Sequence, residues 1–372
     1  MKVIGILLWQ LLLALLCLTS SATTFAEGPV RRLLYVAEPG IRNYTEYGGH
    51  GIIVFDIDQG YKFVRRIPFS GLAPDGKPAN VKGICGNAMT GRLYVSTLYH
   101  LICIDLHTDQ VLWQRNYENG CDRMSMSPDG RIIYQPSLEK DNWYVLDAAS
   151  GDVIKELVPK SKAHNTVFSV DGSRVYLAGL GSNLLSIADA STHDIVGTCG
   201  PFANSIRPFT VNGSQTLCFV NVNELLGFEV GDLRTGQKLY RTEVQGFEVG
   251  PVKRHGCPSH GIAMTPDERE IWIADGHNEH LHVFDVAQLP PKQIASIRVR
   301  EQPGWITFSL DGKICWSSTG DVIDTQSHQI THKLTDEEGR MVMSEKVVEV
   351  QLQDNRLIAV GDQFGRGMIL SK

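Results

Sequence analysis

The sequence predicts an all-β protein, a seven-bladed β-propeller of four-stranded blades that is closed by sharing the first blade between N- and C-terminal strands. Two repeated signals favour this fold: short apolar strands that end at an Asp, and tight turns of the S-P-D-G kind. In addition, no segment shows a sustained helical period. Seven units of roughly forty residues, each with about four short strands, are typical of a propeller.

The first signal is an apolar strand that ends at an Asp followed by a turn, as in "VFDIDQG" and "VLDAASGD". It occurs seven times, with the Asp residues 39 to 53 residues apart. These residues are Asp56, Asp105, Asp147, Asp189, Asp232, Asp285 and Asp324. A fixed period of this length indicates one supersecondary unit per repeat, and each unit buries its apolar faces against its neighbours.

The second signal is a tight turn that precedes most of these strands: "MSPDGR", "SVDGSR", "TVNGSQ", "MTPDER" and "SLDGKI". In such turns Asp and Asn bond their own backbone and Gly supplies a positive φ. An alternating strand such as "RVYLA" follows each turn. The turn therefore separates the innermost strand of a blade from the second strand.

Unit six illustrates this assignment. We expect its innermost strand at 261–265, the second at 270–274 and the third at His280–Asp285. The first unit, by contrast, has no turn of this kind before its strands, and the C-terminal "KVVEVQLQDNRLIAVGD" resembles the missing inner strand. Both ends of the chain are thus predicted to share the first blade, which removes an open sheet edge from the ring.

The repeats also resemble the YVTN repeat family of exported propellers, whose blades read S-P-D-G-x-x-V-Y-V-A-N…V-x-V-I-D…T-G. "MSPDGRIIYQPSLEKDNWYVLDAASGDVIKEL" and "FSVDGSRVYLAGLGSNLLSIADASTHDIVGTC" match this pattern closely. The resemblance covers nearly the whole mature chain and implies the propeller fold. It does not imply one activity, because such propellers include binding proteins, lactonase-like enzymes and heavy chains of quinone-dependent dehydrogenases.

Residues 1–26 are predicted to be a secretory signal peptide, because an apolar run from Val3 to Leu18 is followed by small polar residues and Thr24-Phe25-Ala26. Residues 27–372 then form a single propeller domain, exported to the periplasm or secreted. No second apolar run is long enough to span a membrane. A net charge of −6 without a basic stripe argues against nucleic-acid binding.

Seven cysteines follow residue 26, which is an odd number at low density. They are Cys85, Cys103, Cys121, Cys199, Cys218, Cys257 and Cys315. Several lie within apolar runs, as in "LICID" and "LCFV", where a buried free thiol is the ordinary interpretation. One disulfide is possible, but the sequence does not indicate which residues would form it.

The entrances of the innermost strands supply the candidate binding site. These strands line the central channel, so their first residues surround one end of it. Sheet cores favour apolar residues, yet several of these positions are polar or charged. The predicted ligand-binding residues are Lys82, Asp122, Arg123, His164, Asn165, Arg207, His260 and Trp305. The alternative is a wet channel that binds only water; convergent polar groups in a concave site favour a binding site.

The H-x-H pair His280 and His282 has the spacing of zinc ligands on a strand. However, the positions equivalent to His282 in other units are mostly apolar or aromatic, so His282 is predicted to be structural; they hold Ile53, Ile102, Tyr144 and Ser186. No metal ligand is therefore assigned. The loops 37–50, 137–142, 275–280 and 244–260 are expected at the same end of the channel as His260, together with His255 and His277.

These observations favour an exported binding or scaffold module whose polar channel mouth takes an anionic small molecule or a protein partner. Lys82, Arg123 and Arg207 supply the positive charge, and Arg binds carboxylate or phosphate in a bidentate manner. No G-x-S-x-G, H-E-x-x-H or haem-binding motif is present, and the sequence identifies neither catalytic residues nor a cofactor. Two alternatives remain open: a metal-assisted lactonase-like hydrolase, and a subunit that partners a redox protein.

Overall fold

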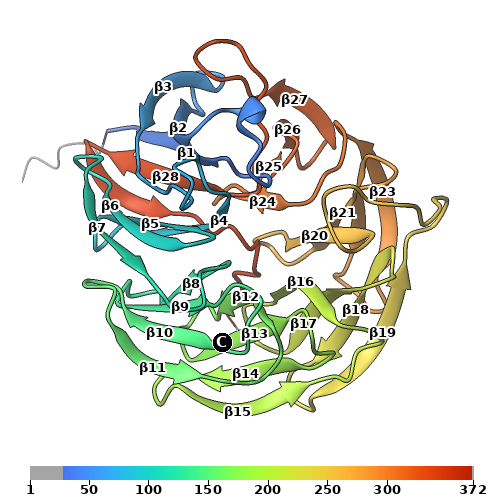
Figure 1. The fold of residues 1–372 in the computed structure, drawn as a ribbon. Helices are drawn as coiled ribbons and strands as arrows, with labels where there is room; N and C mark the ends of the chain where they lie inside the picture. Colours follow the sequence, from blue (N-terminus) through green and yellow to red (C-terminus); the bar gives the residue numbers. More distant parts are fainter. Residues whose placement is uncertain (1–27, 371–372) are drawn as a thin grey trace, which may run out of the picture.

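The computed structural model describes residues 28–370, which form seven antiparallel sheets arranged as blades around a central axis (Figure 1). The fold class predicted from the sequence is confirmed. Within these residues the one helical element is a short 3-10 turn, η1 (Thr45–Tyr47). The same residues contain no helix long and apolar enough to cross a membrane. The predicted signal peptide, residues 1–26, lies outside the described part of the chain.

Blade 1 contains the first and the last strands of the described chain and has five strands in the order β29-β28-β1-β2-β3. Their bounds are β29 (Arg356–Val360), β28 (Val347–Gln353), β1 (Val30–Glu38), β2 (Gly51–Asp56) and β3 (Lys62–Ile67).

Blades 2 to 7 follow in chain order, and each has four strands. Blade 2 consists of β4 (Val81–Asn87), β5 (Arg92–Thr97), β6 (His100–Asp105) and β7 (Val111–Asn116). Blade 3 consists of β8 (Ser125–Met126), β9 (Ile132–Pro136), β10 (Trp143–Asp147) and β11 (Val153–Leu157). Blade 4 consists of β12 (Ala163–Phe168), β13 (Arg174–Gly179), β14 (Leu185–Asp189) and β15 (Asp194–Cys199).

The remaining three blades repeat this pattern. Blade 5 consists of β16 (Ile206–Val211), β17 (Leu217–Val222), β18 (Gly227–Asp232) and β19 (Gln237–Glu243). Blade 6 consists of β20 (Ser259–Met264), β21 (Glu270–Asp275), β22 (His280–Asp285) and β23 (Lys292–Arg298), close to the strands predicted for unit six. Blade 7 consists of β24 (Ile306–Phe308), β25 (Ile314–Ser317), β26 (Asp321–Asp324) and β27 (Gln329–Lys333).

Burial decreases from the axis outward within each blade. In blade 4 every residue of β12 is buried, whereas β15 is mostly exposed. The inner strands are buried because both faces of a blade pack against neighbouring blades, and the buried residues include polar ones such as His164 and Asn165 in β12. Seven apolar clusters fill these interfaces.

The predicted S-P-D-G turns have the expected geometry. In blade 3, Ser127 Oγ donates to Asp129 Oδ1 over 2.6 Å, and the same carboxylate accepts from the Arg131 backbone N–H at 3.1 Å. Gly130 has φ +71°, a conformation that other residues adopt at a cost. Each carboxylate therefore binds the backbone of its own turn, and these Asp residues are structural.

Closure through the first blade is also confirmed. β28 pairs with β1 in an antiparallel ladder that runs from Val36↔Val347 to Val30↔Gln353. β29 adds a fifth strand next to β28, which the sequence pattern did not distinguish from the predicted inner strand. The ladder gives β1 a hydrogen-bonded neighbour on each side, since β2 pairs with its other edge.

The chain after β29 crosses the axis at the far end of the channel, and Figure 1 shows this last segment, in red, running through the middle of the ring. Gln363 bonds three blades: its Oε1 accepts from Ile84 N, its Nε2 donates to Met124 O, and its carbonyl accepts from Trp305 Nε1. The Gly365 carbonyl accepts bonds from blades 5 and 6. The C-terminal segment 361–370 therefore closes the channel opposite the mouth.

We expect deletion of residues 347–372 to abolish cooperative melting or cause aggregation, because it exposes an edge of β1 and opens the ring. Deletion of 361–372 alone is the matched comparison: it keeps blade 1 intact and should lower the melting temperature without loss of cooperativity. Circular dichroism melts and size-exclusion chromatography measure both effects. A 347–372 deletion that melts like the intact chain would contradict the proposed closure.

Candidate functional site

A small cavity of about 90 Å³ lies at the channel mouth, the end where the innermost strands begin. A water molecule in liquid occupies about 30 Å³, so the cavity has room for only a few waters or a small polar group. Its lining is strongly basic. It contains six Lys or Arg side chains, three histidines and two carboxylates: Arg42, Lys82, Arg123, Arg207, Arg254, Lys346, His164, His255, His260, Glu139 and Glu345.

The cavity adjoins a wider groove of about 700 Å³ over blades 2 and 3. The two share Arg42, Asn80, Lys82 and Glu139 in their linings. The groove is also lined by Tyr44, Leu98 and Leu138, which gives it an aromatic and aliphatic portion. A ligand with a polar head and a larger body can therefore occupy both.

Asp122 organises one side of the mouth from a fully buried position. Its Oδ2 accepts from His164 Nδ1 over 2.7 Å, and its Oδ1 lies 3.3 Å from Lys82 Nζ. Burial alone would raise the pKa of Asp122, but Lys82 and His164 outweigh burial, so the pKa lies well below its usual value. Asp122 is thus an anion at neutral pH, and it holds two of the lining residues in place.

Arg123 and Glu345 form an ion pair that links blade 3 to the entrance of blade 1. Arg123 also lies 3.2 Å from His164 Nε2, and its guanidinium stands 4.5 Å above the Trp305 ring. Both members of the pair are almost completely buried. Such a pair requires further polar contacts to offset the loss of hydration.

Lys346 provides such a contact from the next position in the chain. Its Nζ lies 2.6 Å from Glu345 Oε2 and donates to the Gly40 carbonyl over 3.0 Å. Burial lowers the pKa of Lys346 to about 7, although Glu345 acts in the opposite direction. Burial would raise the pKa of Glu345, but Lys346 and Arg123 hold that pKa well below its ordinary value.

His255 and His260 stack with their ring centroids 4.3 Å apart. His260 Nδ1 lies 2.9 Å from the Gly304 carbonyl, which only accepts, so Nδ1 carries the proton and Nε2 presents a lone pair. Burial lowers the pKa of His255 to about 4, and burial together with His255 lowers the pKa of His260 well below its usual value. Both rings are therefore neutral at pH 7.

His255, His260 and Glu345 each offer one ligand atom within 4.8 Å of the other two. Two neutral imidazoles and a carboxylate are donors that zinc accepts. The buried His255 Nε2 also has no hydrogen-bond partner among the described residues. However, Arg123 and Lys346 already occupy Glu345 Oε2, and both cations would repel a metal ion.

The structure brings together five of the eight residues predicted from the sequence: Lys82, Arg123, His164, Arg207 and His260 line one cavity. Asp122 lies directly behind Lys82 and His164. Asn165 and Trp305 do not line the cavity. Asn165 is buried, and its amide group has no hydrogen-bond partner within residues 28–370, whereas Trp305 lies beneath Arg123.

Among the charged lining residues, Arg42, Glu139 and Arg254 belong to loops that were expected at the mouth, whereas two residues were missed altogether, Glu345 and Lys346. The last two occupy the entrance to β28, the inner strand of blade 1. In the other blades the entrance of the inner strand is recognised by its position before the turn that follows the strand, and blade 1 lacks this turn signal. Their position was the only signal for them in the sequence: residues 344–346 directly precede "VVEVQ", where the inner strand of blade 1 was expected.

The loops at the mouth differ in their contribution. Ile41, Glu139 and His255 from three of the four predicted loops line the cavity. His277, from the fourth loop, is exposed, and its ring contacts the Pro251 carbonyl instead. The expectation that His255 faces the mouth is thus confirmed, whereas His277 does not contribute to the cavity lining.

The H-x-H pair is structural, as predicted for His282. This ring is fully buried, with Nδ1 2.9 Å from Ser296 Oγ and Nε2 3.1 Å from Asp275 Oδ2. Both nitrogens are therefore occupied by protein partners. His280 instead contacts the Asn278 carbonyl.

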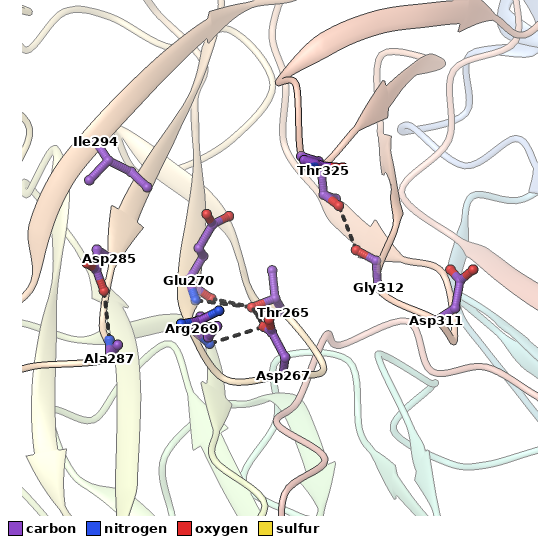
Figure 2. Close-up of a pocket in the computed structure, with 11 residues that line it drawn as sticks. Thr265, Asp267, Arg269, Glu270, Asp285, Ala287, Ile294, Asp311, Gly312 and Thr325 are labelled. Atoms are coloured by element: carbon purple, nitrogen blue, oxygen red, sulfur yellow. Dashed lines mark hydrogen bonds between the residues drawn. The ribbon is translucent and has the colours of Figure 1, made fainter.

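A larger hollow of about 430 Å³ lies between the turns of blades 6 and 7 (Figure 2). Its acidic residues belong to the repeated turns. Asp267 accepts from Thr265 Oγ1 over 2.6 Å, and Asp285 accepts from the Ala287 backbone N–H over 2.9 Å. Because these carboxylates are used by their own turns, the channel mouth is the stronger candidate site.

No protein-family model and no curated protein matches this sequence. The similarity to YVTN-repeat propellers therefore remains a resemblance in sequence pattern, supported at the level of the fold alone.

We expect the free energy of unfolding to fall as the pH decreases from about 6.5 to 4. An unfolded His takes up a proton near pH 6.5, whereas folded His255 resists protonation down to about pH 4, so acid favours the unfolded chain. His255 alone contributes up to about 3 kcal/mol of this change. His255→Asn should flatten the dependence, measured by urea unfolding at several pH values.

The exposed His277 provides the matched control, and His277→Asn should retain the wild-type slope. An unchanged slope in His255→Asn would show that the buried ring does not cause the acid sensitivity.

Proposed function

We propose that this protein is an exported binding module whose channel mouth binds the anionic head of a small molecule. The observation that supports this most directly is the charge of the lining, where six basic side chains face two carboxylates. Asp122 adds one negative charge behind them. A cavity with an excess of fixed cations is complementary to an anion.

Arg42 and Arg207 carry the argument further because neither forms an ion pair with a described carboxylate. Arg207 Nε donates to Asn223 Oδ1, and its Nη2 donates to the Gly256 carbonyl at 3.2 Å. Arg42 Nη2 donates to the Arg254 carbonyl. These contacts orient each guanidinium and leave its charge uncompensated, which suits a carboxylate or phosphate ligand.

The volumes indicate how such a ligand would be placed. The cavity of about 90 Å³ accommodates a carboxylate or phosphate group but not a drug-sized molecule. The remainder of the ligand would lie in the groove against Tyr44, Leu98 and Leu138. An acidic side chain of a protein partner offers the same head group, so the chemistry of the cavity is common to both classes of ligand.

A metal-assisted hydrolase is the second candidate, favoured by the three ligand atoms of His255, His260 and Glu345. A divalent metal there would polarise an ester carbonyl, and the neutral imidazoles already have the protonation state that a metal requires. Its weakness is the ion pairing of Glu345, because Arg123 and Lys346 lie at Oε2 and already compensate the carboxylate charge that a metal ion would need, although Oε1 faces His255.

We expect the mature protein to bind inorganic phosphate or a small carboxylate such as malonate, and Arg42→Gln with Arg207→Gln to weaken that binding. A hydrogen bond to a charged group contributes about 1.5–3 kcal/mol, so each substitution should reduce affinity about tenfold or more. Folding should be preserved, because neither Arg pairs with a buried carboxylate. Isothermal titration calorimetry and thermal melts measure the two effects.

Lys313→Gln is the matched control, since this exposed Lys lies in a turn outside the cavity lining. Titration with Zn²⁺ distinguishes the second candidate. Tight zinc binding that is lost in His255→Ala, together with no phosphate or malonate binding, would replace the anion site by a metal site.

A further inference from the structure

Two of the cysteines touch each other across the interface between blades 4 and 5. Cys199 ends β15, the outer strand of blade 4, and Cys218 lies in β17, the second strand of blade 5. Their Sγ atoms are 3.8 Å apart, and both side chains are fully buried in one apolar cluster. No second hydrogen bond between two thiols occurs within residues 28–370.

Gly231 shows that the two sulfurs share a single space. A Cβ atom added to this glycine would lie 2.6 Å from Cys199 Sγ and 2.8 Å from Cys218 Sγ. A glycine within a strand is unfavourable unless another group approaches the backbone closely. Here both sulfurs occupy the volume that a side chain at position 231 would fill, so a larger residue than glycine would clash with them.

We propose that Cys199 and Cys218 form a disulfide that joins blade 4 covalently to blade 5 in the exported protein. A disulfide bond is about 2.05 Å long, so the sulfurs need to approach by about 1.8 Å. Rotation about the two Cα–Cβ bonds has to supply this approach, in the space next to Gly231. The other described cysteines remain thiols.

The chemistry is thiol–disulfide exchange with a disulfide donor, such as oxidised glutathione or an oxidised thiol–disulfide oxidoreductase. The Cys199 thiolate attacks one donor sulfur, which forms a mixed disulfide and releases one donor thiol. The Cys218 thiolate then attacks Cys199 Sγ and releases the second donor thiol. Two cysteine thiols are oxidised and the donor disulfide is reduced to two thiols.

Burial restricts this reaction to the folding chain, since both sulfurs are shielded in the finished propeller. The predicted signal peptide directs the chain to a compartment in which disulfides form and persist. The bond would close a short loop that contains β16, the inner strand of blade 5. It would therefore restrict the unfolded chain and hold two neighbouring blades together.

The test uses the mature chain, unfolded with reductant and refolded in mixed oxidised and reduced glutathione. Free thiols are then alkylated under denaturing conditions and counted by mass spectrometry. We expect the Cys199 and Cys218 thiols to be protected, and the peptide that spans both to be lighter by two hydrogen atoms. Reductant should restore alkylation of both and lower the melting temperature by roughly 5 °C or more.

Cys199→Ala and Cys218→Ala should each leave the remaining partner alkylated and make the melting temperature insensitive to reductant. Cys315→Ala, at another fully buried cysteine, is the matched control and should retain both the protected pair and the reductant-dependent shift. Alkylation of every thiol in the refolded wild-type protein, or a bond between other cysteines, would overturn the proposal.

Discussion

The arrangement of the mouth depends on the ion pair between Arg123 and Glu345, two charges buried near the axis of a ring of sheets. A buried charge without a partner is so unfavourable that every neighbour has to provide compensation. The Trp305 ring lies under the Arg123 guanidinium, and His164 Nε2 accepts a hydrogen bond from Arg123 Nη1. Lys346 binds the carboxylate of Glu345. This pair also connects blades 3 and 1, so it links the middle of the chain to the strand that closes the ring.

The same pairing determines which charges are left for a ligand. Asp122 is used by Lys82 and His164, and Glu345 is used by Arg123 and Lys346. These internal contacts pair each of the two carboxylates with two basic side chains, although Arg123 Nε has no hydrogen-bond partner among the described residues. The positive charges without a carboxylate partner are consequently those of Arg42 and Arg207. Their guanidinium groups donate to carbonyl and amide oxygens instead. Preorganised cations of this kind lose little freedom when they bind an anion, so more of the interaction appears as affinity.

The sequence was sufficient for the fold because the propeller repeats one local pattern, an alternating strand on each side of an Asp-containing turn. The sequence predicted the residues that line the cavity at the mouth less completely. Neighbouring residues on a strand point to opposite faces. At the entrances of blades 3 and 4 the prediction named two adjacent residues, and only one of each pair lines the cavity: His164 does so in blade 4, whereas Asn165 does not. Glu345 and Lys346 were missed for a different reason. Blade 1 combines the first strands of the chain with the last ones, and it lacks the S-P-D-G-type turn that marks the inner strand in the other blades.

The C-terminal segment was unpredictable because its position depends on tertiary contacts alone. It has no regular hydrogen-bonding pattern of its own, and its polar groups bind strands of several blades. Its effect on the mouth is nevertheless direct: Trp305 stacks under Arg123 and donates its indole N–H to Gln363. One side chain thus contacts both the charged lining and the segment that closes the far end. Trp305 therefore couples the position of the Arg123 guanidinium to that of the C-terminal segment.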